Sequence, residues 1–448
     1  MALALILRYK LDMQVLIDQQ SAVNRWLERL GVRFGVYKNN VFHEQLFPFD
    51  PIPRVIPRSD WINIEKGLIQ RVSALNEFLL DIYGAKKIVS AGVIPEAFIY
   101  GSKGYLAQCE GIVPYKKVYT HISGIDLVQA EDGSWVILED NLRIPSGASY
   151  PIIARTVSRR VSPKTFSQAH IADNRDYTAL LSKLMDSMNG GGLSVILTPG
   201  RYNSAFFEHS FFAEKTGATL AFPGDLVVEN DKVYYKGLFN TKERVGAIYR
   251  RVSDEYLDPL AFEGSSMLGV PNLMRAYSKG NVTIMNALGN GIADDKGLCY
   301  FVPKMIEYYL NEKPILQNAP TYLPYYEKDR EYILKNIRTL VIKDVSEAGG
   351  YGVMFGKDMD ENQLNRIQHL INTEPRRWIA QEVIQFKDLN ILEPNGTGCR
   401  KADLRAFILY GNDIKVWASG LTRYAFEANS FVVNSSQGGG FKDTWVEI

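Results

Sequence analysis

The stretch Gly124-Ile-Asp-Leu-Val-Gln-Ala-Glu-Asp-Gly-Ser-Trp-Val-Ile-Leu-Glu-Asp-Asn141 carries the strongest local signal in the chain. Two runs rich in apolar residues flank the Asp-Gly pair at 132–133, and this pattern is the strongest short-range indication of a β-hairpin. A two-residue turn at this pair places Asp126 directly opposite Glu139. A four-residue loop over 131–134 gives the same register.

The predicted hairpin brings three oxygen-bearing side chains to one face. Asn141 lies two residues beyond Glu139, so it points to the same side as Glu139 and Asp126. Opposed acids destabilise a sheet unless something offsets their repulsion, and two carboxylates with an amide oxygen suit Mg²⁺. A solvated hairpin face, where water screens the charges, is the alternative. The polar loop that follows, which contains Arg143, favours a site because it continues the same surface.

The bulk composition is that of a soluble globular protein. The chain has 448 residues, enough for two or three packed subdomains, with 46% hydrophobic and 23% charged residues. Its 51 basic and 50 acidic residues leave a formal charge of +1, which argues against nucleic acid as the main partner. Cys109, Cys299 and Cys399 form neither a metal pair nor a disulfide pattern. No apolar run approaches the ~18–20 residues of a membrane span, so we expect a cytoplasmic protein without a membrane partner. The oligomeric state does not follow from the sequence.

Hydrophobic periodicity and turn residues predict several helices and strands along the chain. The apolar spacing over 60–84 predicts an amphipathic helix that begins at Asp60 and stops at Gly84. A strand–helix–strand pattern followed by a hairpin predicts an α/β unit within 191–250, although Gly200 stands there without the GxGxxG motif of dinucleotide sites. The predicted elements of that unit are strands 193–198 and 218–222, helix 203–215 and hairpin 226–235. Later predicted elements are strands 339–343 and 378–384 and a hairpin over 405–421.

A lysine and a glycine-rich loop suggest a phosphate site. Lys343 ends an apolar strand, and the loop after it contains Gly349, Gly350 and Gly352. A lysine inside a strand is unusual without an anionic partner, and glycines let backbone N–H groups approach phosphate oxygens. The Walker A pattern is missing, and an ordinary flexible loop is the alternative.

The strand that ends at 381–384 has the composition of a nucleotide-binding edge. Gln381 and Glu382 precede the apolar pair Val383 and Ile384. We expect backbone bonds to adenine from this segment and a carboxylate for ribose, with a plain edge strand as the alternative.

Together these residues resemble the circularly permuted ATP-grasp family, which includes relatives of glutathionylspermidine synthase. The resemblance extends over nearly the whole chain. Its motifs include Leu138-Glu-Asp-Asn-Leu-Arg143, Pro145-Ser-Gly147, Leu197-Thr-Pro-Gly200, Asp403-Leu-Arg405 and the stretches 286–296 and 433–440. In an unpermuted ATP-grasp chain the lysines precede the carboxylates, whereas here the hairpin comes first. Because chain ends tend to lie close together at the surface, the same site can form after the ends have moved.

The resemblance implies an α/β, circularly permuted ATP-grasp fold and a carboxylate–amine ligase that uses ATP and Mg²⁺. Three regions follow from it: a helical part with the metal-binding hairpin (1–190), a Rossmann-like pre-ATP-grasp subdomain (191–285) and a nucleotide-binding part (286–448). The implied Mg²⁺ ligands are Asp126, Glu139 and Asn141. The implied nucleotide-binding residues are Lys296, Lys343, Ser346, Gly349, Gly350, Tyr351, Gly352, Gln381, Glu382, Val383 and Ile384.

The implied reaction forms an acyl phosphate, which an amine then attacks, and releases ADP and phosphate. It requires positioning and charge neutralisation rather than a covalent nucleophile. Arg251, Arg405 and Arg143 are the candidates to stabilise the acyl phosphate, with a structural ion pair as the alternative for each. Similar enzymes carry an arginine close before the first metal aspartate, whereas this chain has Ser123 and Gly124 there. The choice among the three arginines therefore stays open at this point.

Three other functions compete with a ligase of small-molecule or peptide substrates. The first is the modification of a protein or ribosomal peptide, and the second is nucleotide binding without catalysis. The third, a Rossmann oxidoreductase, lacks its glycine fingerprint. The joint presence of Asp126, Glu139, Asn141, Lys296 and Lys343 argues against a decayed site, since ligands that repel each other would then be lost.

Overall fold

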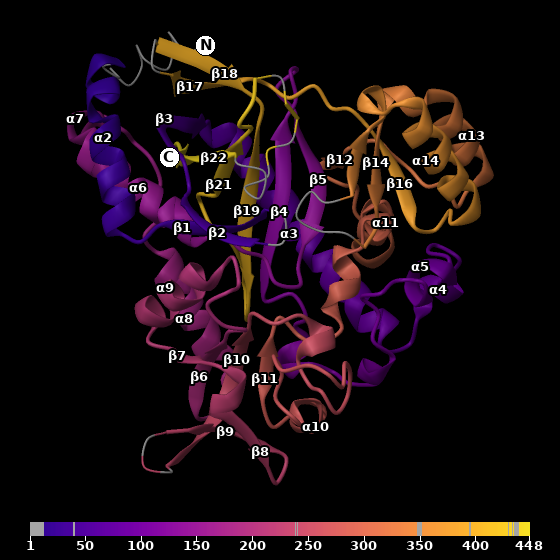
Figure 1. Ribbon diagram of the computed structural model, residues 1–448. Helices are drawn as coiled ribbons and strands as arrows, with labels where there is room; N and C mark the ends of the chain where they lie inside the picture. The colour runs from indigo at the N-terminus through magenta and orange to yellow at the C-terminus, as the bar shows by residue number, and fades with distance from the viewer. Residues whose placement is uncertain are drawn as a thin grey trace.

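The computed structural model describes residues 13–38, 41–237, 239, 241–346, 352–393, 396–428, 430–431, 433 and 439–448 (Figure 1). Its largest sheet has the strand order β12-β5-β4-β19-β21-β22-β3, with β20 paired to β19. The strands are β3 (Phe49–Ile56), β4 (Ile122–Gln129), β5 (Trp135–Asn141), β12 (Gln317–Asn318), β19 (Ala402–Tyr410), β20 (Ile414–Val416), β21 (Leu421–Tyr424) and β22 (Gly440–Val446). β3 and β22 pair in parallel, so segments near the two ends of the sequence lie side by side in this sheet.

One long helix, α3 (Arg58–Ile82), covers one face of this central sheet. Its apolar stripe packs in one core cluster with inward-facing residues of β4 and β5, such as Ile125 and Ile137. The predicted helix is confirmed, but Asp60 is not its N-cap, because Pro57 occupies that position without a side-chain bond. The Asp60 carboxylate instead accepts a hydrogen bond of 3.2 Å from the Trp135 indole, which ties α3 to the hairpin.

A second sheet has the order β7-β6-β10-β9-β8, with β11 paired to β10. Its strands are β6 (Leu193–Leu197), β7 (Thr219–Ala221), β8 (Leu226–Glu229), β9 (Lys232–Lys236), β10 (Lys242–Arg250) and β11 (Thr283–Met285). β6 pairs in parallel with β7 and β10, and β10 pairs in parallel with β11. The predicted strand–helix–strand run is confirmed, with α9 (Phe206–Thr216) between β6 and β7. That this sheet belongs to a Rossmann-like subdomain stays a prediction.

A third, four-stranded sheet forms the lobe drawn in orange in Figure 1. It contains β13 (Thr321–Tyr322), β14 (Leu340–Asp344), β15 (Val353–Phe355) and β16 (Trp378–Glu382), and its hydrophobic core includes residues of α13 (Glu327–Asn336) and α14 (Glu361–Thr373). The short helix α11 (Lys296–Cys299) lies between this lobe and the central sheet. The predicted strands 339–343 and 378–384 are confirmed with shifts of one or two residues.

Two small hairpins and several helices complete the described part of the chain. The hairpins are β1 (Arg33–Lys38) with β2 (Val41–Leu46), and β17 (Leu389–Glu393) with β18 (Gly396–Arg400). The remaining α-helices are α2 (Met13–Arg29), α4 (Lys87–Ser90), α5 (Glu96–Tyr100), α6 (Ser149–Val161), α7 (Pro163–Gln168), α8 (Tyr177–Met188), α10 (Leu273–Ser278) and α12 (Val302–Met305). None of the helices among the described residues is long and apolar enough to cross a bilayer.

Candidate active site

The hairpin of β4 and β5 pairs Asp126 with Glu139 as predicted, but by a different route. Ala130 N–H donates to Ser134 O at 2.8 Å, so the loop has three residues, and both the predicted two-residue turn and the four-residue alternative are wrong. If the strand pairing continued without interruption from this loop, Glu139 would lie opposite Ile125 and face the buried side of the sheet. Leu138 is an extra residue in β5, and this β-bulge shifts the register so that Glu139 faces the Asp126 side.

Two arginines hold Asp126 in its ionised form. Arg405 lies directly across from Asp126 in β19, and its Nε and Nη2 donate to the two carboxylate oxygens at 2.6 and 2.7 Å. Arg423 of β21 donates to the same carboxylate at 2.9 Å and also binds Asp403. Burial alone would raise the pKa of Asp126, but the two guanidinium groups outweigh it and hold that pKa well below its usual range.

A cavity of about 140 Å³ separates the central sheet from the four-stranded lobe. Its polar and charged lining residues are Asp126, Glu139, Lys296, Lys343, Gln381, Glu382, Asp403 and Arg423. Its apolar lining residues are Leu138, Val341, Val353, Phe355, Val383, Ile384, Phe386, Phe431 and Val433. The structure therefore brings together predicted residues that lie more than 250 positions apart in the sequence.

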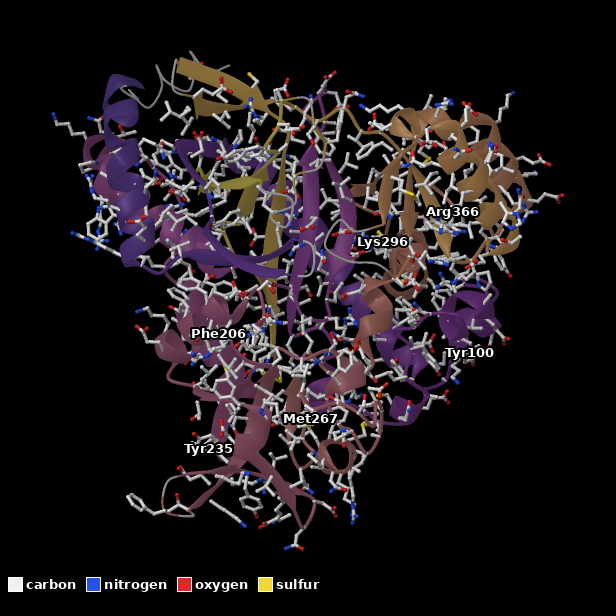
Figure 2. All side chains as sticks on the ribbon, viewed as in Figure 1. Tyr100, Phe206, Tyr235, Met267, Lys296 and Arg366 are labelled. Carbon is white, nitrogen blue, oxygen red and sulfur yellow. The ribbon has the colours of Figure 1, made fainter. Side chains whose placement is uncertain are left out.

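The two predicted phosphate-binding lysines share this cavity. Lys343 lies in β14 between Val353 and Ile379 of the adjacent strands. Lys296 is the first residue of α11, and in Figure 2 it lies between the central strands and the orange lobe. Burial lowers the pKa of Lys343; the carboxylate of Glu139 opposes this shift, and the positive charge of Lys296 adds to it. Glu139 and Lys296 are thus close enough to Lys343 to affect its pKa.

The two polar residues at the end of β16 point in opposite directions, as neighbours in a strand do. Gln381 faces the same side as Lys343 and donates to Thr321 Oγ1 at 2.9 Å. The Glu382 carboxylate accepts hydrogen bonds from the hydroxyl groups of Tyr322 and Tyr332 at 3.0 and 2.9 Å. Glu382 lines the cavity while its carboxylate is bound to these two tyrosines of the lobe.

The predicted glycine loop is only partly within the described residues. Ser346 begins it, and its N–H and hydroxyl donate to the Asp344 carboxylate at 2.9 and 2.8 Å. Gly352 ends it with a φ of +72°, which a residue with a side chain rarely adopts. Gly349, Gly350 and Tyr351 lie outside the described residues.

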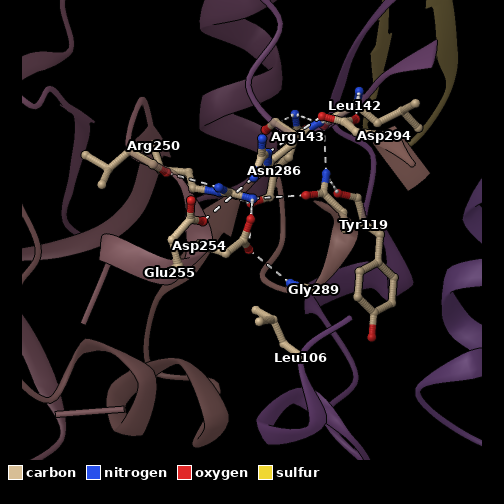
Figure 3. Close-up of polar contacts among 12 residues, drawn as sticks. Leu106, Tyr119, Leu142, Arg143, Arg250, Asp254, Glu255, Asn286, Gly289 and Asp294 are labelled. Carbon is tan, nitrogen blue, oxygen red and sulfur yellow. Dashed lines mark hydrogen bonds and ion pairs between the residues drawn. The ribbon is translucent and has the colours of Figure 1, made fainter. Parts of the chain in front are cut away.

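The three candidate arginines occupy different environments. Arg251 is buried, and its guanidinium holds the 145–147 loop through Pro145 O at 2.8 Å and Ser146 Oγ at 2.6 Å. Arg143 lies 3.7 Å from carboxylate oxygens of both Asp294 and Glu255, within the polar cluster of Figure 3. None of the three arginines is among the residues that line the cavity, but Arg405 is bound to Asp126, which does line it.

Sequence reasoning did not single out Arg423 or Asp403 as site residues. Asp403 and Arg405 alternate along β19, so both side chains project to one face, and Arg423 pairs with Asp403 from β21. Opposite charges at 403 and 405, where the predicted 405–421 hairpin begins, together with an arginine two residues beyond its end, are the signal that could have revealed them.

Asp126, Glu139 and Asn141 carry oxygen donors of the kind that Mg²⁺ takes, and both oxygens of Asp126 also accept hydrogen bonds from Arg405 or Arg423. Asn141 Nδ2 lies 3.4 Å from Asp126 Oδ2, so the amide of Asn141 lies beside the two paired carboxylates. Mg²⁺ typically takes one or two protein carboxylates and completes its shell with water and phosphate oxygens. Within the ranges that the structure describes, no group of three or more His, Cys, Asp or Glu side chains is arranged to hold a metal. The hairpin supplies only two carboxylates, so the proposed site depends on the amide oxygen.

Comparison with known proteins identifies the family. The pattern of the family described as "Circularly permuted ATP-grasp type 2" matches residues 53–425. The chain belongs to this family. An uncharacterized protein of Synechocystis sp. is 42% identical over 444 residues, which cover 98% of this chain and 92% of that protein. A Mycobacterium tuberculosis protein, also uncharacterized, is 42% identical over 408 residues, or 90% of this chain and 74% of that protein.

Two further relatives carry functional names. A Frankia casuarinae protein called "Putative glutamate--cysteine ligase 2-2" is 37% identical over 96% of this chain, which spans 52% of that longer protein. A glutathione synthetase-like effector from Globodera pallida shares the fold, with a TM-score of 0.57 and 12% identity over 98% of this chain and 99% of that one. This circularly permuted ATP-grasp protein is an ATP-dependent ligase of the carboxylate–amine class, and its family generally uses ATP and Mg²⁺.

Proposed function

We propose that this ligase works through an acyl phosphate. A substrate carboxylate oxygen attacks the γ-phosphorus of ATP, and ADP leaves with the electrons of the broken P–O bond. An amine nitrogen then attacks the acyl carbon, loses a proton and expels inorganic phosphate. The observation that carries the proposal is the single cavity in which Lys296 and Lys343 face the paired carboxylates of Asp126 and Glu139.

Different parts of the cavity lining suit different parts of the ATP molecule. Its aromatic and aliphatic residues, such as Phe355 and Ile384, suit the adenine ring, whereas the two lysines suit the phosphates. The side chains of Asp126, Glu139 and Asn141 would hold Mg²⁺. The ion would neutralise negative charge on the phosphates as they react.

Arg405 is the best placed of the three arginines to bind the acyl phosphate. A guanidinium has five N–H groups, and Arg405 uses three of them on Asp126 and Ser146 O among the described residues. The remaining two can bind a substrate oxygen next to the proposed metal. Arg251 is committed to the 145–147 loop, so we assign it to holding that loop against Arg405.

Amino acids and short peptides are the first substrates to test. The name of the Frankia relative contains glutamate and cysteine, and the name of the structural relative contains glutathione synthetase. A protein or ribosomal-peptide tail is the second acceptor class, because the named relatives do not restrict the size of the acceptor.

The deciding experiment measures nucleotide products while mixtures of carboxylates and amines are screened. We expect ADP and phosphate, and hydroxylamine should trap the acyl phosphate as a hydroxamate in place of the amine. AMP and pyrophosphate as obligatory products would mean adenylation, and the acyl-phosphate mechanism would then be wrong. Arg405→Ala should abolish the hydroxamate while ATP binding remains.

A further inference from the structure

Two adjacent arginines in the loop before β16 form ion pairs with residues next to the two lysines of the cavity. Arg376 forms an ion pair with Asp295 at 2.7 Å, and Arg377 forms one with Asp344 at 2.7 Å. Asp295 immediately precedes Lys296, and Asp344 immediately follows Lys343. Each arginine therefore holds the residue next to one lysine.

Arg376 is anchored on three sides. Besides Asp295, it donates to Ala97 O at 3.1 Å and Phe98 O at 3.2 Å in the α5 region, and its guanidinium stacks over the Phe98 ring at 4.5 Å. The Asp295 carboxylate also caps α11 through the Gly297 N–H at 2.8 Å. Lys296 thus begins a helix whose first turn is fixed to the lobe.

Backbone bonds connect the same segments. Val345 N–H donates to Arg377 O at 3.0 Å, and Lys296 N–H donates to Val345 O at 3.4 Å. Val345 follows Asp344, so the chain around Lys343 lies between the arginine pair and the start of α11. A displacement of either arginine would change the separation of the two lysines.

We propose that Arg376 and Arg377 are positioning residues that set Lys296 and Lys343 at a fixed spacing for a triphosphate. This inference rests on the proposed function, because it needs the lysines to bind phosphate. Arg376 has the larger share, since its ion pair is mostly buried, with side-chain exposures of 16% and 6%. The Arg377 side chain is 49% exposed, and water weakens such a pair.

A double-mutant cycle separates positioning from general stability. Arg376→Met should raise the Kd for ATP about tenfold, as is typical when the partner that orients a ligand-binding group is lost. In a Lys296→Ala background the same change should have little further effect, because Arg376 acts through Lys296. Isothermal titration measures both Kd values, and thermal melting checks that each variant is folded.

A second variant and a control keep the result interpretable if Arg376→Met fails to fold. Asp295→Asn retains the oxygen that caps α11 and removes the charge that binds Arg376. It should therefore give the same result as Arg376→Met: a higher Kd for ATP by itself, and little further effect in the Lys296→Ala background. Arg338→Met removes an ion pair to Glu361 on the exposed surface of the same lobe, and it should leave the Kd unchanged.

Equal losses of affinity with and without Lys296 would overturn the inference and leave the proposed function intact. Failure of the wild-type protein to bind ATP would overturn the proposed function and this inference with it.

Discussion

The Arg405 side chain lies against Gly124, in the space that a side chain at position 124 would fill. A Cβ atom on Gly124 would be 3.2 Å from Arg405 Cδ and 3.0 Å from Pro145 Cβ. The absence of a side chain at Gly124 in β4 therefore leaves room for the Arg405 side chain from β19.

This arrangement makes Gly124→Ala informative. The added methyl group must displace Arg405 or Pro145, so we expect turnover to fall about tenfold while the Kd for ATP stays unchanged. Steady-state kinetics and titration calorimetry measure the two quantities. Gly190→Ala is the control, because a Cβ there meets nothing within 4 Å. If Gly124→Ala keeps its turnover and Arg405→Ala is also active, Arg405 has no role in the reaction.

The hairpin shows what the sequence can and cannot predict. Strand type, the approximate turn and the pairing of Asp126 with Glu139 were all predictable, because apolar runs and an Asp-Gly pair are local signals. The three-residue loop and the bulge at Leu138 were not predictable, and each changes the register by one position. These two shifts in register cancel, so Asp126 and Glu139 pair as predicted.

Contacts between distant segments were harder to foresee. The lysines and acids could be assigned to one site only through the family resemblance, since no local pattern joins β5 to β14. The direction of Glu382 depends on which face of β16 meets α13, and that face is decided by the packing of the lobe. Arg423 lies in a strand whose neighbours are fixed only when the sheet closes.

The metal assignment predicts a conditional stabilisation by nucleotide. Mg·ATP at about 100 times its Kd should add ~2.7 kcal/mol to the free energy of unfolding, whereas ATP with excess chelator should add much less. The reason is that the Glu139 carboxylate, which lines the same cavity as the two lysines, would repel the phosphates unless a cation lay between them. Melting curves with and without chelator measure the difference. Equal stabilisation in both would argue that the hairpin holds no metal.

Glu139→Gln should lower turnover far more than it lowers ATP affinity. The amide keeps the shape of the side chain but loses the charge that would hold the metal, and that metal matters most when the phosphate transfers. We expect turnover to fall at least about a hundredfold, as for the loss of one main electrostatic group in a catalytic site. Comparable losses in turnover and affinity would instead place Glu139 among the residues that only bind substrate.

The charge of Lys343 predicts how ATP binding depends on pH. Burial lowers its pKa below the usual 10.5, and the nearby charge of Lys296 lowers it further. Only the protonated lysine attracts phosphate, so the Kd for ATP should rise as the pH passes upward from neutral through the lowered pKa. The increase should therefore begin below pH 10.5, which titration calorimetry over an alkaline pH series can measure.

Two variants assign that increase to Lys343. Lys343→Arg should remove it, because a guanidinium stays protonated throughout this range. Lys296→Met should move it to higher pH, because the loss of a neighbouring positive charge makes the Lys343 ammonium easier to keep. An increase that keeps its position in both variants would come from another group, and Lys343 would then lie too far from the phosphates for the proposed role.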